Sequence, residues 1–145
     1  MRRRVVITGL GITSPVGNTI DSAWDNLVNG RSGIGPITRF DASDFNSQIA
    51  GEVKDFDVSK YLNAREAKQM DTFIHYGLAA SMDAWRDSGL EIDQINPERA
   101  GVIVSSGIGG LPRIEETQTA YLEKGPRRIN PFFVPASLIN LISGH

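Results

Sequence analysis

The strongest pattern along the chain is an apolar stripe with helical spacing between residues 70 and 88. Its members recur three or four positions apart and are Met70, Phe73, Ile74, Leu78, Met82 and Trp85. This spacing places the apolar side chains on one face of a helix. Gly89 follows the stripe, and glycine is a common helix stop. We therefore predict a core-facing helix from about Met70 to Ser88.

Two shorter stretches also have helical patterns. The first is formed by Ile20, Ala23, Trp24, Leu27 and Val28, with Gly30 placed to end it. The second runs from near Leu111 to Leu122 and is broken by Gly125 and Pro126. The apolar residues from Ser137 to Ser143 predict the start of a further helix, after a rigid connector over residues 131–135.

Two continuous β-branched runs predict buried strands. They are Val5-Val6-Ile7-Thr8 and Ala100-Gly101-Val102-Ile103-Val104. The segment Gln48–Val53 is a possible third strand, whereas Gly33–Asn46 has the composition of a loop. Strand–helix–strand alternation favours an α/β fold with a mainly parallel sheet. The apolar segment Leu138–Ile142 would have little left to cover it, so we expect the front part of a larger fold.

Composition narrows the possible functions. The chain has 145 residues, the size of one ordinary domain, and 15 basic against 17 acidic residues give a net charge of −2. This balance argues against nucleic-acid binding through a wholly basic surface. Cysteine is absent, which excludes disulfides, zinc–thiolate sites and a cysteine nucleophile within these residues. No apolar run is long enough to span a membrane or, after Arg2–Arg4, to form a signal peptide, so a cytoplasmic protein is expected.

Two glycine-rich segments lie at predicted strand ends. Gly9-Leu10-Gly11 invites a dinucleotide-binding interpretation, but Ser14 takes the place of the third glycine, so a nucleotide-binding module is only a minor alternative. Ser105–Gly110 contains three glycines beyond a strand, where ligands bind in open α/β sheets. A tight turn is the simpler explanation for this segment. Ile108, set among the glycines, would be poorly anchored and free to swing.

Two basic pairs are the other candidate binding features. Arg65 with Lys68, and Arg127 with Arg128, form either a solvated surface or a grip for an acidic partner. His75 has no second ligand three or four residues away, so a metal site there is not expected. No Ser/His/Asp set and no acid–base pair of carboxylates is recognisable.

Several ordered motifs together resemble the β-ketoacyl-[acyl carrier protein] synthases. They begin with residues 4–11 and Ser14-Pro15-Val16-Gly17-Asn18, and continue with Phe40-Asp41, Lys68-Gln69-Met70-Asp71, Asp87-Ser88-Gly89-Leu90, Ser106–Gly110, residues 125–128, residues 130–135 and Ser143-Gly144-His145. The resemblance extends along the whole chain but over only about the first third of a complete synthase. Ile108 among the glycines, with Phe132-Phe133, is similar to the type II elongating enzymes.

The resemblance implies a thiolase-like layered α-β-α-β-α fold, of which this chain would be the first part of the N-terminal half, and a homodimer. It implies decarboxylating condensation of a malonyl-carrier protein with an acyl group held on a cysteine. Two histidines would stabilise the developing negative charge. The cysteine and both histidines of the family lie beyond residue 145, so no catalytic residue is expected in this chain, and no metal or other cofactor is implied.

The resemblance also assigns peripheral roles. Ile108 matches the residue that gates the acyl pocket, and Phe133 and Val134 match pocket-wall residues. The positions expected to contact the acidic acyl carrier protein are Arg65, Lys68, Arg127 and Arg128. Gln69 replaces a further basic residue often found there. A second interpretation is a non-catalytic, condensing-enzyme-like subunit that sets chain length, since such a scaffold also needs no cysteine.

Overall fold

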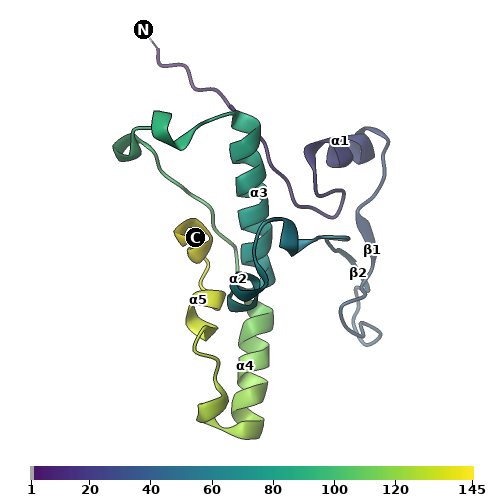
Figure 1. The fold of residues 1–145 in the computed structure, drawn as a ribbon. Coiled ribbons are helices and arrows are strands. Elements are labelled where there is room, and N and C mark those ends of the chain that lie inside the picture. The colour runs from purple at the N-terminus through teal and green to yellow at the C-terminus, as the bar shows by residue number, and fades with distance from the viewer. Residues whose placement is uncertain (1) are drawn as a thin grey trace.

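Helix α3, Thr72–Ser88, forms the axis of the computed structural model, which describes residues 2–145 (Figure 1). The predicted stripe is confirmed at its first half, where Met70 and Ile74 are buried. The stripe weakens toward the other end, where the Trp85 side chain is 43% exposed. Gly89 ends the helix in the left-handed conformation, with φ of 63°, as its position in the sequence predicts.

A small core joins α3 to the C-terminal segments. Met70 and Ile74 pack with Ile142, and partly buried Leu62, Phe73, Leu78 and Val104 surround them. Ile142 lies in α6, Leu141–Gly144, which follows α5, Phe133–Ser137. The helix predicted for residues 137–143 is therefore split, because residues 138–140 leave the helical conformation.

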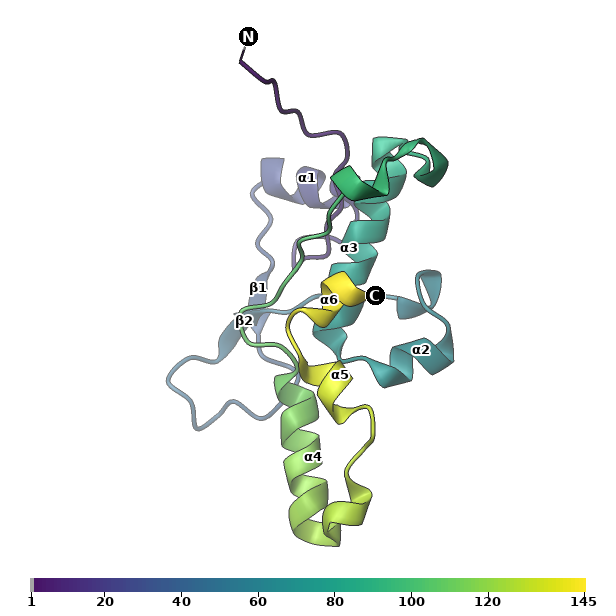
Figure 2. The same cartoon turned by 90° about the vertical axis from the view of Figure 1, so that its left-hand side faces the viewer.

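Helices α3 and α4 begin at the same place and run in opposite directions. Helix α4, Leu111–Lys124, starts beside the first turn of α3 and extends away from it in both views (Figures 1 and 2). It agrees with the predicted helix over 111–122 and ends before Gly125, whose φ is 76°. The molecule is therefore elongated along these two helices.

A separate lobe lies beside α3 and contains α1 and a two-stranded hairpin (Figure 1). Helix α1, Ile20–Val28, begins with a capping box between Thr19 and Ser22 and confirms the predicted helix. Strands β1, Ile34–Pro36, and β2, Ile49–Gly51, pair antiparallel, with Gly35 opposite Ala50. Strand β2 confirms the possible strand over 48–53, whereas β1 lies in a segment predicted to be entirely loop.

The two strands predicted over residues 5–8 and 100–104 are wrong for this structure. Neither segment has strand pairing, and Ile7 and Ile103 are 83% and 97% exposed. The sheet described within residues 2–145 is the antiparallel β1–β2 pair, so the prediction of a mainly parallel sheet is also wrong here. A β-branched run forms a stable strand only where neighbouring strands accept its backbone hydrogen bonds. The residues around these two runs provide none, apart from the Ser143 side chain, which bonds to Val104 at 2.8 Å.

The accessible surface is much larger than that of a compact domain. It measures 11216 Å² for a chain of 15.8 kDa. Folded monomers of this mass expose about 7,300 Å² on the general scaling of surface with mass. Much of the excess is apolar, and includes Val5, Trp24 and Ile103. No helix among residues 2–145 is long and apolar enough to cross a membrane.

Gly9 and Gly11 allow the N-terminal segment to cross α3 at backbone distance. A Cβ at Gly9 would lie 2.1 Å from the Ala84 carbonyl oxygen, and one at Gly11 would lie 1.9 Å from that of Ala80. Between them, the Leu10 N–H donates to the Asp87 carboxylate at 2.8 Å. Helix packing therefore accounts for the glycine pair that suggested a nucleotide site.

Replacing Gly11 with alanine should destabilise the protein. The added methyl group would overlap helix backbone that has no room to move, and overpacking of this kind costs about 1–3 kcal/mol. We expect Gly11→Ala to lower the apparent Tm of the full-length protein in a thermal melt. Gly35→Ala is the matched control, since a Cβ there meets nothing within 4 Å. Equal melting temperatures for the two variants would contradict this packing role.

Candidate functional site

The first candidate surface is a basic groove beside helix α2. This helix, Ala64–Gln69, begins with a capping box in which the Asn63 side chain accepts from the Arg65 and Glu66 amides. The Arg65 and Lys68 side chains are exposed on it. They border a groove of about 540 Å³ that is lined by Ala64, Arg65, Lys68, Gln69, Asn130, Pro131 and Phe132. Two predicted carrier-binding residues thus share a groove with an apolar, aromatic edge.

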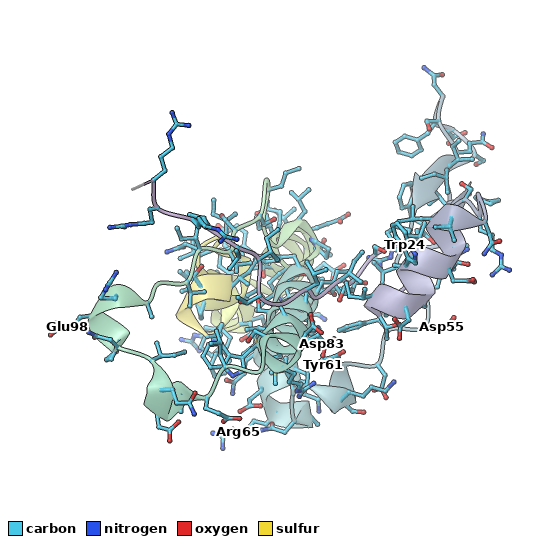
Figure 3. The ribbon with its side chains drawn as sticks, turned by 90° about the horizontal axis from the view of Figure 1, so that it is seen from above. Trp24, Asp55, Tyr61, Arg65, Asp83 and Glu98 are labelled. Carbon is cyan, nitrogen blue, oxygen red and sulfur yellow. The ribbon has the colours of Figure 1, made fainter. Side chains whose placement is uncertain are left out.

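Two polar contacts hold the α2 segment against α3. The His75 Nε2–H donates to the Ala67 carbonyl at 2.9 Å, which makes His75 a hydrogen-bonded structural residue. The Tyr61 hydroxyl donates to Asp83 at 2.7 Å, and the two residues lie together in Figure 3. Burial raises the pKa of the Tyr61 phenol, and the Asp83 carboxylate raises that pKa further. Both contacts hold helix α2 in place on α3, and so determine the position of the Arg65 and Lys68 side chains.

The second basic pair follows helix α4. Arg127 and Arg128 lie on a short 3₁₀ helix, Pro126–Arg128, and both are exposed. A smaller groove of about 170 Å³ lies beside Arg128 and is lined by Arg113, Glu116, Thr117, Ala120, Arg128 and Asn130. Asn130 lines both grooves, so the structure brings Arg128 to the neighbourhood of the groove beside α2. Arg128 thus lines a groove that adjoins the α2 groove at Asn130, although it is about 60 residues from Arg65 and Lys68 in sequence.

The glycine-rich loop over Ser105–Gly110 packs against the end of α5. The Gly109 N–H donates to the Ser106 hydroxyl at 3.0 Å, and the Gly110 N–H donates to the Ser137 carbonyl at 3.2 Å. Gly109 has φ of 86°, and a Cβ there would lie 2.5 Å from the same Ser137 oxygen. The loop backbone is therefore fixed at its C-terminal end.

The predicted acyl-pocket residues lie on these two adjoining segments. Ile108, in the glycine loop, is 67% exposed, which agrees with the expectation of a weakly anchored side chain. Val134 on α5 is 57% exposed, and Phe133 beside it is half-buried. The structure brings the loop and the helix together, but it leaves Ile108 and Val134 largely open to solvent.

Two further features of the structure are not evident from the sequence. One is a groove of about 880 Å³ between the hairpin and the start of α3, lined by residues that include Phe40, Phe45 and Tyr76. The other is the buried carboxyl group of Asp71, which is 5% exposed. An aspartate directly before a helix signals an N-cap, but its actual partner, Arg113, is 42 residues away. Within residues 2–145, no group of three or more His, Cys, Asp or Glu side chains is arranged to hold a metal ion.

Comparison with known proteins matches this chain to one family over almost its entire length. Residues 2–145 match the model of the β-ketoacyl synthase N-terminal domain. The chain belongs to the β-ketoacyl synthase family. One relative, the 3-oxoacyl-[acyl-carrier-protein] synthase 2 of Vibrio harveyi, is 51% identical over 144 residues, which is 99% of this chain but 35% of that protein. This β-ketoacyl synthase chain therefore spans about a third of the length of the curated relatives it matches.

Solved ketosynthases share its fold. A type II PKS acyl-carrier protein in complex with its ketosynthase, bound to the hexaketide, contains a chain that is 29% identical, with a TM-score of 0.79 over 99% of this chain and 39% of that one. The ishigamide ketosynthase/chain length factor gives 32% identity and a TM-score of 0.80, over 92% of this chain and 34% of that one. These similarities confirm the predicted fold class, the thiolase-like layered α/β fold.

Proposed function

We propose that this chain is the N-terminal part of a type II 3-oxoacyl-[acyl carrier protein] synthase. Such an enzyme condenses an acyl thioester with malonyl-acyl carrier protein and releases CO₂ during fatty acid elongation. The observation that carries the proposal is the basic groove with Arg65 and Lys68, near Arg128, on a chain 51% identical to a 3-oxoacyl-[acyl-carrier-protein] synthase 2. An acidic carrier protein fits this surface by charge, and the relative's name supplies the reaction class.

The bond-making groups of this reaction lie outside these residues. The chain has no cysteine, so it cannot itself form the acyl-cysteine intermediate. In the complete enzyme a cysteine thiolate takes the acyl group and releases the carrier thiol. Malonyl-carrier protein then loses CO₂, and its carbanion attacks the acyl carbonyl and expels the cysteine. Two histidines stabilise the negative charge that develops on the enolate and thioester oxygens.

This chain contributes docking and chain-length selection. Arg65 and Lys68 on one side, and Arg127 and Arg128 on the other, attract the acidic carrier protein and orient it. Exposed charges of this kind act mostly on the association rate and less on the lifetime of the complex. The exposed Phe132 ring gives the same groove an apolar contact.

The acyl chain passes the glycine loop. Ile108 gates the entrance to the acyl pocket, and Phe133 and Val134 form part of its wall, contributed across a homodimer. The exposure of Ile108 and Val134 supports this arrangement, because apolar side chains at an interface remain open until the partner surface covers them. The surface in excess of a compact domain is likewise covered by the remaining two thirds of the synthase and by the partner subunit, in the cytoplasm.

The test is condensation by the full-length protein. Purified enzyme is incubated with an acyl-carrier protein and malonyl-carrier protein, and the products are analysed by intact-protein mass spectrometry. We expect β-ketoacyl-carrier protein and one CO₂ for each product formed. A full-length protein that binds the carrier but yields no product would contradict the enzymatic proposal and would favour a non-catalytic chain-length subunit.

The isolated 145-residue chain should be inactive and poorly folded. It lacks a thiol to accept the acyl group, and its accessible surface of 11216 Å² leaves large apolar segments uncovered. We expect no acylated polypeptide after incubation with radiolabelled acyl-carrier protein, together with strong binding of a hydrophobic dye. A sharp two-state melt of the isolated chain would contradict the folding half of this prediction.

A further inference from the structure

A buried carboxyl group lies where helices α3 and α4 begin. Asp71 is the N-cap residue of α3, but its side chain makes no capping hydrogen bond to that helix. It accepts instead from the Arg113 N–H in the first turn of α4, at 3.0 Å. Pro112 has no N–H, and the Leu111 N–H is bonded to the Gly109 carbonyl at 3.0 Å. Asp71 therefore satisfies the next free amide of α4 from another part of the chain.

The charge of Asp71 suits this position. The first turns of α3 and α4 meet with their axes directed apart (Figures 1 and 2). Each helix start carries a partial positive charge, so two such ends placed together repel one another. A negative side chain between them offsets both charges. With 5% of Asp71 exposed, solvent screens this interaction little.

The start of α4 is also the end of the glycine loop that carries Ile108. Gly110 is the N-cap of α4, and a Cβ there would lie 2.9 Å from the Asp71 Oδ2 atom. Together with the Ser137 carbonyl, which accepts from the Gly110 N–H, Asp71 fixes this end of the loop. Ile108 lies only two residues before the fixed end, with its side chain 67% exposed.

We propose that Asp71 is a positioning residue that holds the Ile108 loop in register and thereby sharpens the choice of acyl chain length. The effect on acyl chain length rests on the proposed function. The anchoring of the loop by Asp71 does not depend on that function. Asp71 contacts no reacting atom in this role. It fixes the backbone from which Ile108 projects, and a less fixed backbone lets Ile108 admit acyl groups that it otherwise rejects.

The test compares Asp71→Asn with the unaltered full-length enzyme by two measurements. Asparagine keeps the shape and one acceptor oxygen but removes the charge. We expect amide hydrogen exchange over residues 109–113 to become about fivefold faster, the change that loss of one helix-capping contact produces. We also expect the ratio of kcat/KM between the preferred and the least-used acyl-carrier protein to fall by about the same factor.

Asp87→Asn is the matched control. Asp87 lies on the same helix and accepts from the Leu10 N–H at 2.8 Å, at the opposite end of α3 from Asp71. Its substitution should leave both the loop exchange and the acyl ratio unchanged. If Asp71→Asn does not fold, Gly110→Ala provides the second variant at the same end of the loop, because its methyl group would lie 2.9 Å from Asp71 Oδ2 and 3.0 Å from the Ala136 carbonyl oxygen and the Ser137 Cα atom.

The outcomes separate the two proposals. Faster exchange over 109–113 with an unchanged acyl ratio would make Asp71 a structural residue only and would overturn the inference. Unchanged exchange would overturn it as well, whatever the kinetics show. An unaltered enzyme that forms no β-ketoacyl product would instead overturn the proposed function, while the exchange measurement would still decide whether Asp71 anchors the loop.

Discussion

Replacing Ile108 with phenylalanine in the full-length enzyme should shift its use strongly toward short acyl groups. Ile108 lies two residues before a loop end that is fixed by the bond from Gly110 to Ser137, which limits how far the backbone can move to accommodate a larger ring. Overpacking costs about 1–3 kcal/mol, which corresponds to a fall of about 5- to 150-fold in kcat/KM for long acyl groups. Competition between short and long acyl-carrier proteins measures the shift directly.

Leu122→Phe is the control for this prediction. Leu122 is an aliphatic residue on α4 that is 71% exposed, and it lies away from the glycine loop. The same kind of enlargement there should leave the acyl preference unaltered. An Ile108→Phe enzyme with the wild-type preference would contradict the role of Ile108 as a gate.

Reversing the basic surface should weaken carrier-protein binding. We expect the double variant Arg65→Glu with Lys68→Glu, and separately Arg127→Glu with Arg128→Glu, to raise Kd by about tenfold or more. Exposed ion pairs contribute about 0.2–1 kcal/mol each, and reversal replaces each attraction with a repulsion. Because exposed charges are screened by salt, the binding of each variant should also depend less on salt concentration than that of the unaltered protein. Surface plasmon resonance at two salt concentrations measures both effects.

A second double variant controls for net charge. Arg31→Glu with Arg99→Glu changes the total charge by the same amount, but at positions in the α1 lobe and on the 3₁₀ helix Pro97–Arg99. Figure 3 shows the neighbouring Glu98 at the opposite edge of the molecule from the α1 lobe, where Trp24 lies. Equal weakening by all three double variants would indicate a general charge effect and would contradict docking at the basic groove.

The helices are the part of the fold that the sequence predicts best. Helix α3 carries both of its signals locally, an apolar stripe around Ile74 and a stop at Gly89, and α4 ends before Gly125 as predicted. The strands over 5–8 and 100–104 are predicted from continuous β-branched runs, which are a local signal only. A strand depends on partners elsewhere in the chain, and no local pattern states whether those partners are present.

The candidate site divides in the same way. Arg65 and Lys68 are three positions apart on one helix, so their shared face follows from helical spacing. The proximity of Arg65 and Lys68 to Asn130 and Phe132 cannot be predicted from helical spacing. It depends on the path that the chain takes after α4. The bond from Arg113 to Asp71 spans 42 residues and was invisible for the same reason. Gly9 and Gly11 resemble a nucleotide motif only weakly, and the helix backbone they pack against cannot be identified from the local sequence.

The exposed apolar segments at residues 5–7 and 102–103 are made at different times during synthesis, so the first is exposed for several seconds before the second exists. Ile7 is 83% exposed and Ile103 is 97% exposed, and both carry unpaired backbone groups that can pair with another chain. At about 5–20 residues per second, a ribosome takes roughly 5–19 s to go from the first segment to the second. Throughout that interval, and after residue 103 is made, the N-terminal β-branched segment stays exposed, because neither segment pairs with the other in this structure. We therefore expect newly made protein to need a chaperone at its N-terminus before any later segment can cover it.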